Sequence, residues 1–199
     1  MTAPHLIGIA ASLSLLAGWR LYAAVLALGL AVRFGPESVA APLHGVAALG
    51  NPWVLGVAGI AALAEAFADK IAWLDSAWDA VHTAIRPIGG ALLALALVRP
   101  GDPAMEVIVL LLGGGAALAA HAAKAGTRAV VNVSPEPLSN VAVSTAEDVV
   151  TGGAMWLTLA HPAWAAGIAA VLASGVALLL WWSWRTLGGL LARLRGWLA

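Results

Sequence analysis

Cysteine is absent from the sequence, which excludes disulfide bonds and thiolate metal sites. Charge is scarce as well: Asp, Glu, Lys and Arg make up 10% of the 199 residues, whereas about 25% is usual in soluble domains. Acidic and basic residues balance to a formal net charge of zero, so nucleic acid is not an expected partner. The N-terminus lacks the basic region of a signal peptide, and its apolar run exceeds the roughly 7–15 residues of a signal-peptide core. We therefore expect the first apolar segment to be retained.

Most of the chain is apolar. Hydrophobic residues make up 62% of it, and the mean hydropathy is +0.93. A soluble fold of this size has no interior large enough to bury so much apolar surface, so the surrounding solvent must be lipid. About 20 apolar residues suffice for a helix to span a bilayer. We expect an all-α membrane protein of about six such segments, at 6–32, 52–68, 87–98, 104–123, 141–160 and 163–182.

The third of these runs is too short to span a bilayer alone, so its helix must extend before Pro87 or kink there. Residues 1–182 are interpreted as one integral membrane domain with halves at 1–100 and 101–182. Residues 183–199 have leucines at helical spacing together with arginines, which predicts a basic amphipathic helix on the cytoplasmic membrane surface, suited to anionic lipids. An ordinary helical tail is the alternative. Paired and tripled glycines along the segments are compatible with a homo-oligomer.

Orientation follows from the basic residues. With six spans, most Lys and Arg residues fall on the side that also receives both termini. The positive-inside rule then predicts that both termini are cytoplasmic.

Two arginines follow the same Ala-Gly step, Arg20 in the first apolar run and Arg128 after the fourth. An arginine in the middle of a membrane segment costs about 2.5–3.5 kcal/mol on insertion scales. Glu65 and Glu147 follow in the same order, each behind an alanine. Three segments in each half would invert the second half, as in secondary transporters with a mid-membrane site between their halves. This hypothesis pairs the two arginines with the two glutamates across a pseudo-two-fold axis; chance matching of short motifs is the alternative.

The successive residues of a mainly acidic stripe are four, three and four positions apart, a spacing that places them on one face of a helix. It comprises Asp75, Asp79, His82 and Arg86. Asp69, one turn after Glu65, precedes it. Carboxylates and imidazoles at this spacing suit a bound cation or a proton relay. A structural ladder of ion pairs is the alternative, with Asp75 and Asp79 paired to Arg86 and Lys70.

A second, basic stripe has spacings of three, four and four residues. It comprises His121, Lys124, Arg128 and Asn132. We expect it to face the acidic stripe, where it would bind an anionic head group or a carboxylate, or else neutralise the acidic stripe. Neither stripe matches a specific metal motif, and no catalytic triad or phosphate-binding loop is recognisable. No metal ligand, cofactor or catalytic residue is therefore assigned.

The stretch 133–140 contains two prolines, so we do not expect it to be regular helix; Asn140, Ser144, Glu147 and Asp148 follow. Irregular backbone at membrane depth is tolerated only where it lines a cavity or is buried in protein. The stretch is therefore a candidate re-entrant element, with an ordinary external loop as the alternative.

Together these motifs resemble a bacterial inner-membrane family known only as domain of unknown function forty-one twenty-six. The residues that carry the resemblance are Ala17-Gly18-x-Arg20, Asp69-Lys70, Leu74-Asp75, Trp78-Asp79, His82-Thr83-x-x-Arg86-Pro87, His121-x-x-Lys124-Ala-Gly-x-Arg128, Asn140, Ser144 and Glu147-Asp148. The resemblance covers almost the whole chain except the basic tail. It implies a small multi-pass protein of the bacterial inner membrane and supplies no activity.

The favoured function is transport or permeation of a small solute, ion or lipid head group, in which Asp75, Asp79 and His82 would gate the pathway or relay protons. Two alternatives remain: a membrane-embedded lipid-modifying enzyme with His82 or His121 as acid-base, and a non-catalytic scaffold acting through its tail. The residues expected to line a substrate or ion pathway are Arg20, Glu65, Asp69, Asp75, Asp79, His82, Arg86, His121, Lys124, Arg128, Asn140, Ser144, Glu147 and Asp148.

Overall fold

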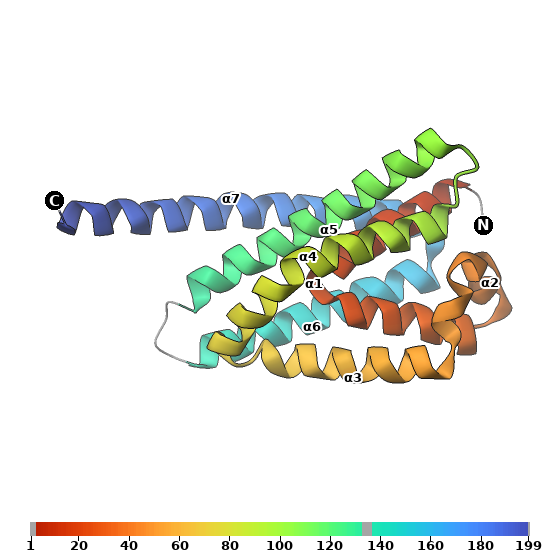
Figure 1. Ribbon diagram of the computed structural model, residues 1–199, viewed down its shortest axis with the longest axis horizontal. Helices are drawn as coiled ribbons and strands as arrows, with labels where there is room; N and C mark the ends of the chain where they lie inside the picture. The colour runs from red at the N-terminus through yellow and green to blue at the C-terminus, as the bar shows by residue number, and fades with distance from the viewer. Residues whose placement is uncertain (1–2, 133–136, 199) are drawn as a thin grey trace.

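The computed structural model describes residues 3–132 and 137–198, and all regular structure within these ranges is helical (Figure 1). The expected all-α class is confirmed. In chain order the elements are α1 (Ala3–Phe34), α2 (Glu37–Ala40), the 3₁₀-helix η1 (Ala41–Gly50), α3 (Pro52–Ala68), α4 (Ala72–Val98), α5 (Pro103–Val131), α6 (Pro137–Ala160), the short 3₁₀-helix η2 (Pro162–Trp164) and α7 (Ala165–Leu198).

Local sequence explains where several helices begin and end. Asn51 and Asp102 cap α3 and α5 by accepting hydrogen bonds from backbone amides of the first turn, and a proline follows each cap. α4 runs through Pro87 and begins at Ala72, as expected from the shortness of its apolar part. It ends at Arg99, which has a left-handed backbone with φ of 47°.

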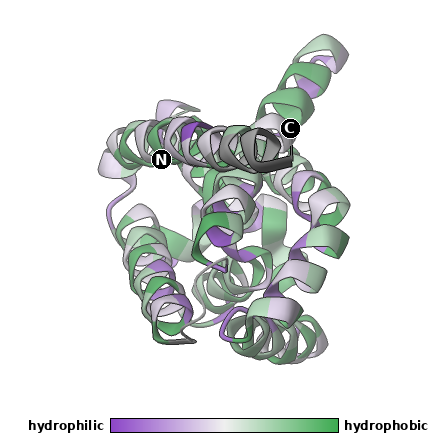
Figure 2. Cartoon of the chain, turned by 90° about the vertical axis from the view of Figure 1, so that its left-hand side faces the viewer, coloured by the Kyte–Doolittle hydropathy of each residue, from purple (hydrophilic) through white to green (hydrophobic). Residues whose placement is uncertain are grey.

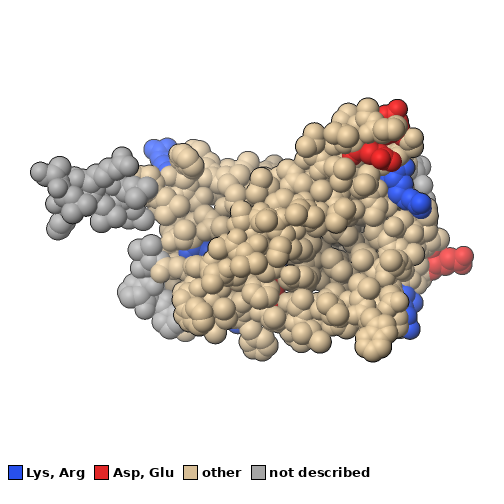
Figure 3. All heavy atoms as spheres, in the orientation of Figure 1, with Lys and Arg blue, Asp and Glu red and all other residues tan. Residues whose placement is uncertain are grey.

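The surface of the bundle is that of a membrane-embedded protein. Helices α1, α4 and α5 and the stretch Pro162–Gly189 are long and apolar enough to cross a bilayer, and η1 with α3, bent by 81°, would make a fifth span. Large apolar side chains face outward, such as Trp53, which is 84% exposed. Figure 2 shows apolar ribbon around the outside of the bundle, and Figure 3 shows the visible charges mainly at the two ends of its long axis. The structure thus has four or five candidate spans among its described residues, fewer than the expected six, because α6, although 24 residues long, is not apolar enough to be one of them.

Helix α1 is broken in its middle. Arg20 has φ of −141° and ψ of 76°, which is not helical, and the two halves of α1 run back toward the same end of the bundle (Figure 1). The first half meets the start of α7 at Gly8, and the second half meets η1, where Arg33 donates to the Gly50 carbonyl at 3.1 Å. The N-terminus and the C-terminus therefore lie at opposite ends of the long axis, unlike the expectation that they share one side.

Helix α7 is the longest element, with 34 residues, or about 51 Å at 1.5 Å per residue. It continues without a break through Ser183 and extends beyond the other helices (Figure 1). The C-terminal tail is therefore an extension of the last apolar helix. Its position on a membrane surface stays a prediction.

The first half of α1 packs closely on α4 and α5 through small residues. A Cβ added to Gly18 would overlap the Ala117 carbonyl oxygen and lie 2.7 Å from the Ala120 Cβ. A Cβ on Gly90 would overlap the Ala117 side chain in the same way. Small residues let helix backbones approach closely in membranes, and here they bring the break in α1 next to α4 and α5.

This packing predicts that Gly18→Ala destabilises the protein by about 1–3 kcal/mol, the usual cost of overpacking. The carbonyl that it meets belongs to a rigid helix and cannot move aside freely. The matched control is Gly115→Ala in α5, where an added Cβ meets no atom within 4 Å and helix propensity improves by up to about 1 kcal/mol. Thermal unfolding in detergent, followed by the fluorescence of the ten tryptophans, measures both. Equal melting temperatures for the two variants would contradict this packing.

Candidate functional site

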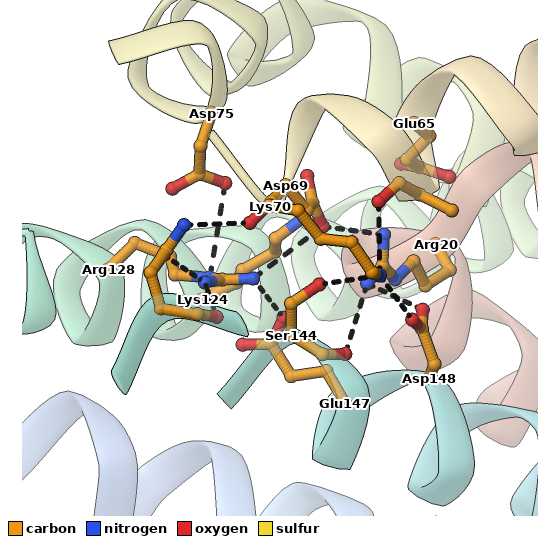
Figure 4. Close-up of polar contacts among 12 residues, drawn as sticks. Arg20, Glu65, Asp69, Lys70, Asp75, Lys124, Arg128, Ser144, Glu147 and Asp148 are labelled. Atoms are coloured by element: carbon orange, nitrogen blue, oxygen red, sulfur yellow. Dashed lines mark hydrogen bonds and ion pairs between the residues drawn. The ribbon is translucent and has the colours of Figure 1, made fainter. Parts of the chain in front are cut away.

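The break in α1 lies beside a cluster of charged side chains contributed by the turn between α3 and α4 and by α4, α5 and α6 (Figure 4). The structure brings together all fourteen residues predicted to line a pathway. Thirteen are joined by hydrogen bonds or ion pairs, and His82 lies at the edge of the cluster. Their role in a pathway stays a prediction.

Asp69 is the centre of this cluster. It follows the last residue of α3 and is fully buried. Its Oδ2 atom lies 2.5 Å from Arg20 Nη1, 2.5 Å from Lys124 Nζ and 3.9 Å from Arg128 Nη2. Burial by itself raises the pKa of the Asp69 carboxyl, but Lys124 and Arg20 outweigh it and hold the pKa below its usual value. One carboxylate thus joins α1, α3 and α5.

The cluster opens to solvent at one edge. Arg20 Nη2 lies 2.6 Å from Asp148 Oδ1, and Lys70 Nζ lies 3.2 Å from Asp148 Oδ2. Lys70 also donates to Ser144 Oγ at 3.4 Å. The side chains of Lys70 and Asp148 are 34% and 37% exposed, whereas Arg20 is buried.

The opposite edge is closed. Arg86 pairs with Glu65 at 2.8 Å and with Asp79 at 2.9 Å, and the side chains of Arg86 and Glu65 are 0% exposed. Arg86 Nη1 also lies 2.7 Å from His121 Nδ1. Thr83 Oγ1 donates to the Asp79 carbonyl and lies 3.0 Å from His121 Nε2. These contacts assign a neutral His121 that accepts from Arg86 at Nδ1 and donates to Thr83 from Nε2.

Arg128 connects the cluster to the start of α6. It donates to the Asn140 side chain at 2.5 Å and to the Asn140 carbonyl at 3.1 Å, and it pairs with Glu147 at 3.1 Å. Asn140 in turn donates to the Asp69 carbonyl, and Asn132 of α5 donates to Asp75 at 3.1 Å. Residues 133–136 of the expected re-entrant stretch lie outside the described residues, and from Pro137 the chain is helix.

The predicted facing of the acidic and basic stripes is confirmed, with Arg86 of α4 against His121 of α5. Arg128 pairs with Glu147, but both residues lie in the second half of the chain, so this pair does not cross the predicted axis between the halves. Lys124 also lies 3.8 Å from the acidic stripe, at Asp79 Oδ1.

The predicted pairing of Arg20 with Glu65 is wrong. Arg20 pairs with Asp69 and Asp148, and Glu65 pairs with Arg86. Glu65 lies one turn before Asp69 on α3, so only Asp69 reaches the break in α1. The two arginines also differ locally, because Arg20 interrupts a helix and Arg128 lies in the last turn of an unbroken one. The inverted repeat stays a prediction.

The sequence interpretation missed Tyr22, and it named Trp78 in a motif but not as a site residue. Tyr22 Oη lies 3.1 Å from His82 Nε2, and the Trp78 ring stacks on His82 with a centroid distance of 4.5 Å. Tyr22 is the only tyrosine in the chain and comes two residues after Arg20, which was a usable signal. Thr83, Asn132 and Lys70, named in motifs but not as site residues, also belong to the cluster.

The cluster contains one more acidic residue than basic ones. Its basic members are Arg20, Lys70, Arg86, Lys124 and Arg128, and its acidic members are Glu65, Asp69, Asp75, Asp79, Glu147 and Asp148. Four of the carboxylates, those of Glu65, Asp69, Asp75 and Asp79, have one buried oxygen without a hydrogen-bond partner within the described part of the chain. Buried charge without full compensation is costly. The arrangement suits a further positive charge, although no group of three or more His, Asp or Glu residues with metal-binding geometry occurs in the described ranges.

The model of one family, described as domain of unknown function (DUF4126), matches residues 7–186 of the chain. No curated protein and no solved structure matches it. The geometry of the cluster is therefore the main guide to function.

The central position of Asp69 predicts that Asp69→Asn destabilises the protein by about 3–5 kcal/mol, because it leaves Arg20 and Lys124 buried without their shared counter-ion. Asp148→Asn removes the other carboxylate of Arg20 at the exposed edge and should cost about 1 kcal/mol or less. Thermal and denaturant unfolding in detergent compares the two variants. Similar losses of stability for both would contradict the assignment of Asp69 as the centre.

Proposed function

We propose a function for this chain, which belongs to the family of domain of unknown function DUF4126: it moves a small cation across the membrane through the buried charge cluster. The observation that carries the proposal is the alternation of carboxylates and basic groups along one connected line. That line runs from the exposed edge, through the break in α1, to the closed edge.

Each basic side chain in this line bridges two carboxylates. Arg20 joins Asp148 to Asp69, at 2.6 and 2.5 Å. Lys124 joins Asp69 to Asp79, at 2.5 and 3.8 Å. Arg86 joins Asp79 to Glu65, at 2.9 and 2.8 Å (Figure 4 shows the first part of the line). A cation that enters at Asp148 therefore meets successive carboxylates, each of which can exchange a bound basic group for the incoming charge.

The excess of acidic over basic residues supports a cation over an anion. The cluster holds one more carboxylate than basic groups, and the unpartnered oxygens of Glu65, Asp69 and Asp79 are free to accept a proton or an ion. Ionisable groups within a membrane bundle are expensive and commonly mark ion or proton pathways. A purely structural set of ion pairs has no need of the additional carboxylate.

The orientation we propose places the end that holds the C-terminus in the cytoplasm of a bacterial inner membrane. The turn between α3 and α4, which holds Lys70, and the C-terminal part of α7, which holds Arg185, lie toward that end (Figure 1). At the opposite end the positive charges of Arg33 and Arg99 are balanced by acidic residues nearby in the sequence. By the positive-inside rule, the exposed edge of the cluster then faces the cytoplasm, and the N-terminus faces away from it.

Removal of the carboxylate at the closed edge tests transport. Purified protein in liposomes is assayed for charge movement driven by gradients of H⁺, Na⁺ or K⁺. Glu65→Gln should lower the flux at least tenfold, because it removes the last carboxyl group of the line, the partner of Arg86, with little change in shape. Glu106→Gln, an exposed acid in the first turn of α5 outside the cluster, should leave the flux unchanged.

Size-exclusion profiles and melting temperatures establish that both variants are folded. A folded Glu65→Gln variant with wild-type flux would refute a role for this carboxylate, and a wild type without any cation flux would refute the proposal itself.

A second candidate, a non-catalytic membrane scaffold, is favoured by the extension of α7 beyond the other helices (Figure 1). This extension carries exposed Trp184, with Arg185 over the Trp181 ring at 5.5 Å. Truncation from Ser183 distinguishes the two functions. Binding to vesicles with anionic lipid should be lost in either case, whereas cation flux should persist only if the protein is a transporter.

A further inference from the structure

Helix α6 carries three hydroxyl side chains on its buried face, Ser144, Thr151 and Thr158, which we name the hydroxyl track. Their exposed fractions are 0%, 2% and 0%. They are spaced by seven residues, two helical turns, so successive members lie about 10 Å apart along α6. Ser144 belongs to the charge cluster, where Lys70 donates to it. Thr158 lies three residues before the exposed His161, at the opposite end of α6.

The hydroxyls of Thr151 and Thr158 have no hydrogen-bond partner in the part of the chain that the structure describes. The other threonines of the described helices behave differently. Thr83, Thr127, Thr145 and Thr186 each donate to the carbonyl oxygen four residues earlier, at 2.8–2.9 Å. Leaving a buried hydroxyl unpaired costs about 1–3 kcal/mol, so these two positions call for a partner that protein atoms do not supply.

The track faces the interior of the bundle. The neighbouring positions Val149, Val150 and Trp156 are exposed and apolar, whereas the track residues are buried, and α6 packs mainly against α1. On α1, the buried Ser12 donates to the Ala165 carbonyl at 2.8 Å, just beyond the end of α6. Buried polar groups therefore continue from the cluster to the far end of the bundle.

We propose that the hydroxyl track is the second part of the translocation pathway, and that the ion it carries is the proton. This inference rests on the proposed function, which needs a route from the cluster to the opposite side of the membrane. The track leaves the cluster at Ser144, which shares the Lys70 amine with Asp148. A file of water molecules, hydrogen-bonded at about 2.8 Å, spans each interval of the track. A threonine hydroxyl accepts a proton from a protonated water on one side and releases its own proton to the water on the other side, so that one O–H bond forms and one breaks at each step.

The spacing of the track argues for the proton over a metal cation. A Mg²⁺ or Ca²⁺ ion needs about six or more oxygen ligands at roughly 2.0–2.6 Å. Single hydroxyls about 10 Å apart cannot replace the hydration shell of such an ion. Beyond Asp148 the track has no carboxylate to offset the charge of a metal ion, whereas hydroxyls and water suffice to pass a proton.

Water in the track can be tested by chemical labelling, because the sequence has no cysteine and any introduced thiol is unique. Thr151→Cys and Thr158→Cys, in membranes, are treated with Ag⁺ and with 2-aminoethyl methanethiosulfonate. We expect them to react with Ag⁺ at least tenfold faster than two controls. Ala94→Cys lies in the buried contact between α4 and α5, and Trp156→Cys lies on the exposed apolar side of α6. Reaction rates equal to those of both controls would overturn the proposal.

Conduction is tested with the double variant Thr151→Val/Thr158→Val, which keeps the shape of both side chains and removes both hydroxyls. Because neither hydroxyl has a hydrogen-bond partner among the described residues, we expect the melting temperature to be kept and proton flux into liposomes to fall at least tenfold. Thr145→Val, on the exposed side of the same helix, should keep the flux.

The outcomes separate this inference from the proposed function. If the wild type conducts protons and the folded double variant conducts them equally well, the role of the hydroxyl track is refuted. The proposed role of the charge cluster is then unaffected. Flux of Na⁺ or K⁺ without proton flux also overturns the track alone. A wild type without any cation flux overturns both.

Discussion

The fold depends on the sharing of one buried carboxylate. Asp69 compensates Arg20 at the break in α1 and Lys124 in α5, and its own backbone carbonyl accepts from Asn140 of α6. Each of these basic groups would be costly inside a membrane bundle without a counter-ion. The turn after α3, the interrupted α1 and the middle of α5 are therefore held together by a single electrostatic requirement, and any relative movement of these helices must exchange ion-pair partners.

Close helix packing makes this arrangement accessible. The glycine and alanine contacts around Gly18 and Ala117 bring the backbones of α1, α4 and α5 near enough for long basic side chains to reach carboxylates on neighbouring helices. The break at Arg20 has a related effect, since it turns the second half of α1 back beside η1. Apolar contacts thus determine the distances between the helices. The ion pairs determine which helices can lie at those distances.

The cluster and the hydroxyl track differ in chemistry and adjoin at one residue. Ser144 belongs to both, because it contacts Lys70 at the exposed edge and begins the row of hydroxyls on α6. The cluster contains ion pairs and one more carboxylate than basic groups. The track contains uncharged hydroxyls, two of which have no hydrogen-bond partner among the described residues. Such a change from charged to neutral polar groups suits a proton, which can be held on a carboxylate and then passed through water.

Several features followed from the sequence alone. Composition required a membrane-embedded all-α protein, and helical periodicity grouped Asp79 with Arg86 and His121 with Arg128, because residues seven apart, about two helical turns, share a helix face whatever the fold. Even the facing of these two stripes was predictable from their opposite charge.

The partners within the cluster were decided only by the tertiary structure. Arg20 pairs with Asp69 instead of Glu65 because the chain reverses direction at Arg20 itself. Nothing in the local sequence predicts that break. Thr151 and Thr158 likewise resemble any helical threonine until burial and the absence of a partner, within the described residues, set them apart. Periodicity determines which side chains share a face, whereas the choice of counter-ion depends on where distant helices meet, and long-range packing decides that.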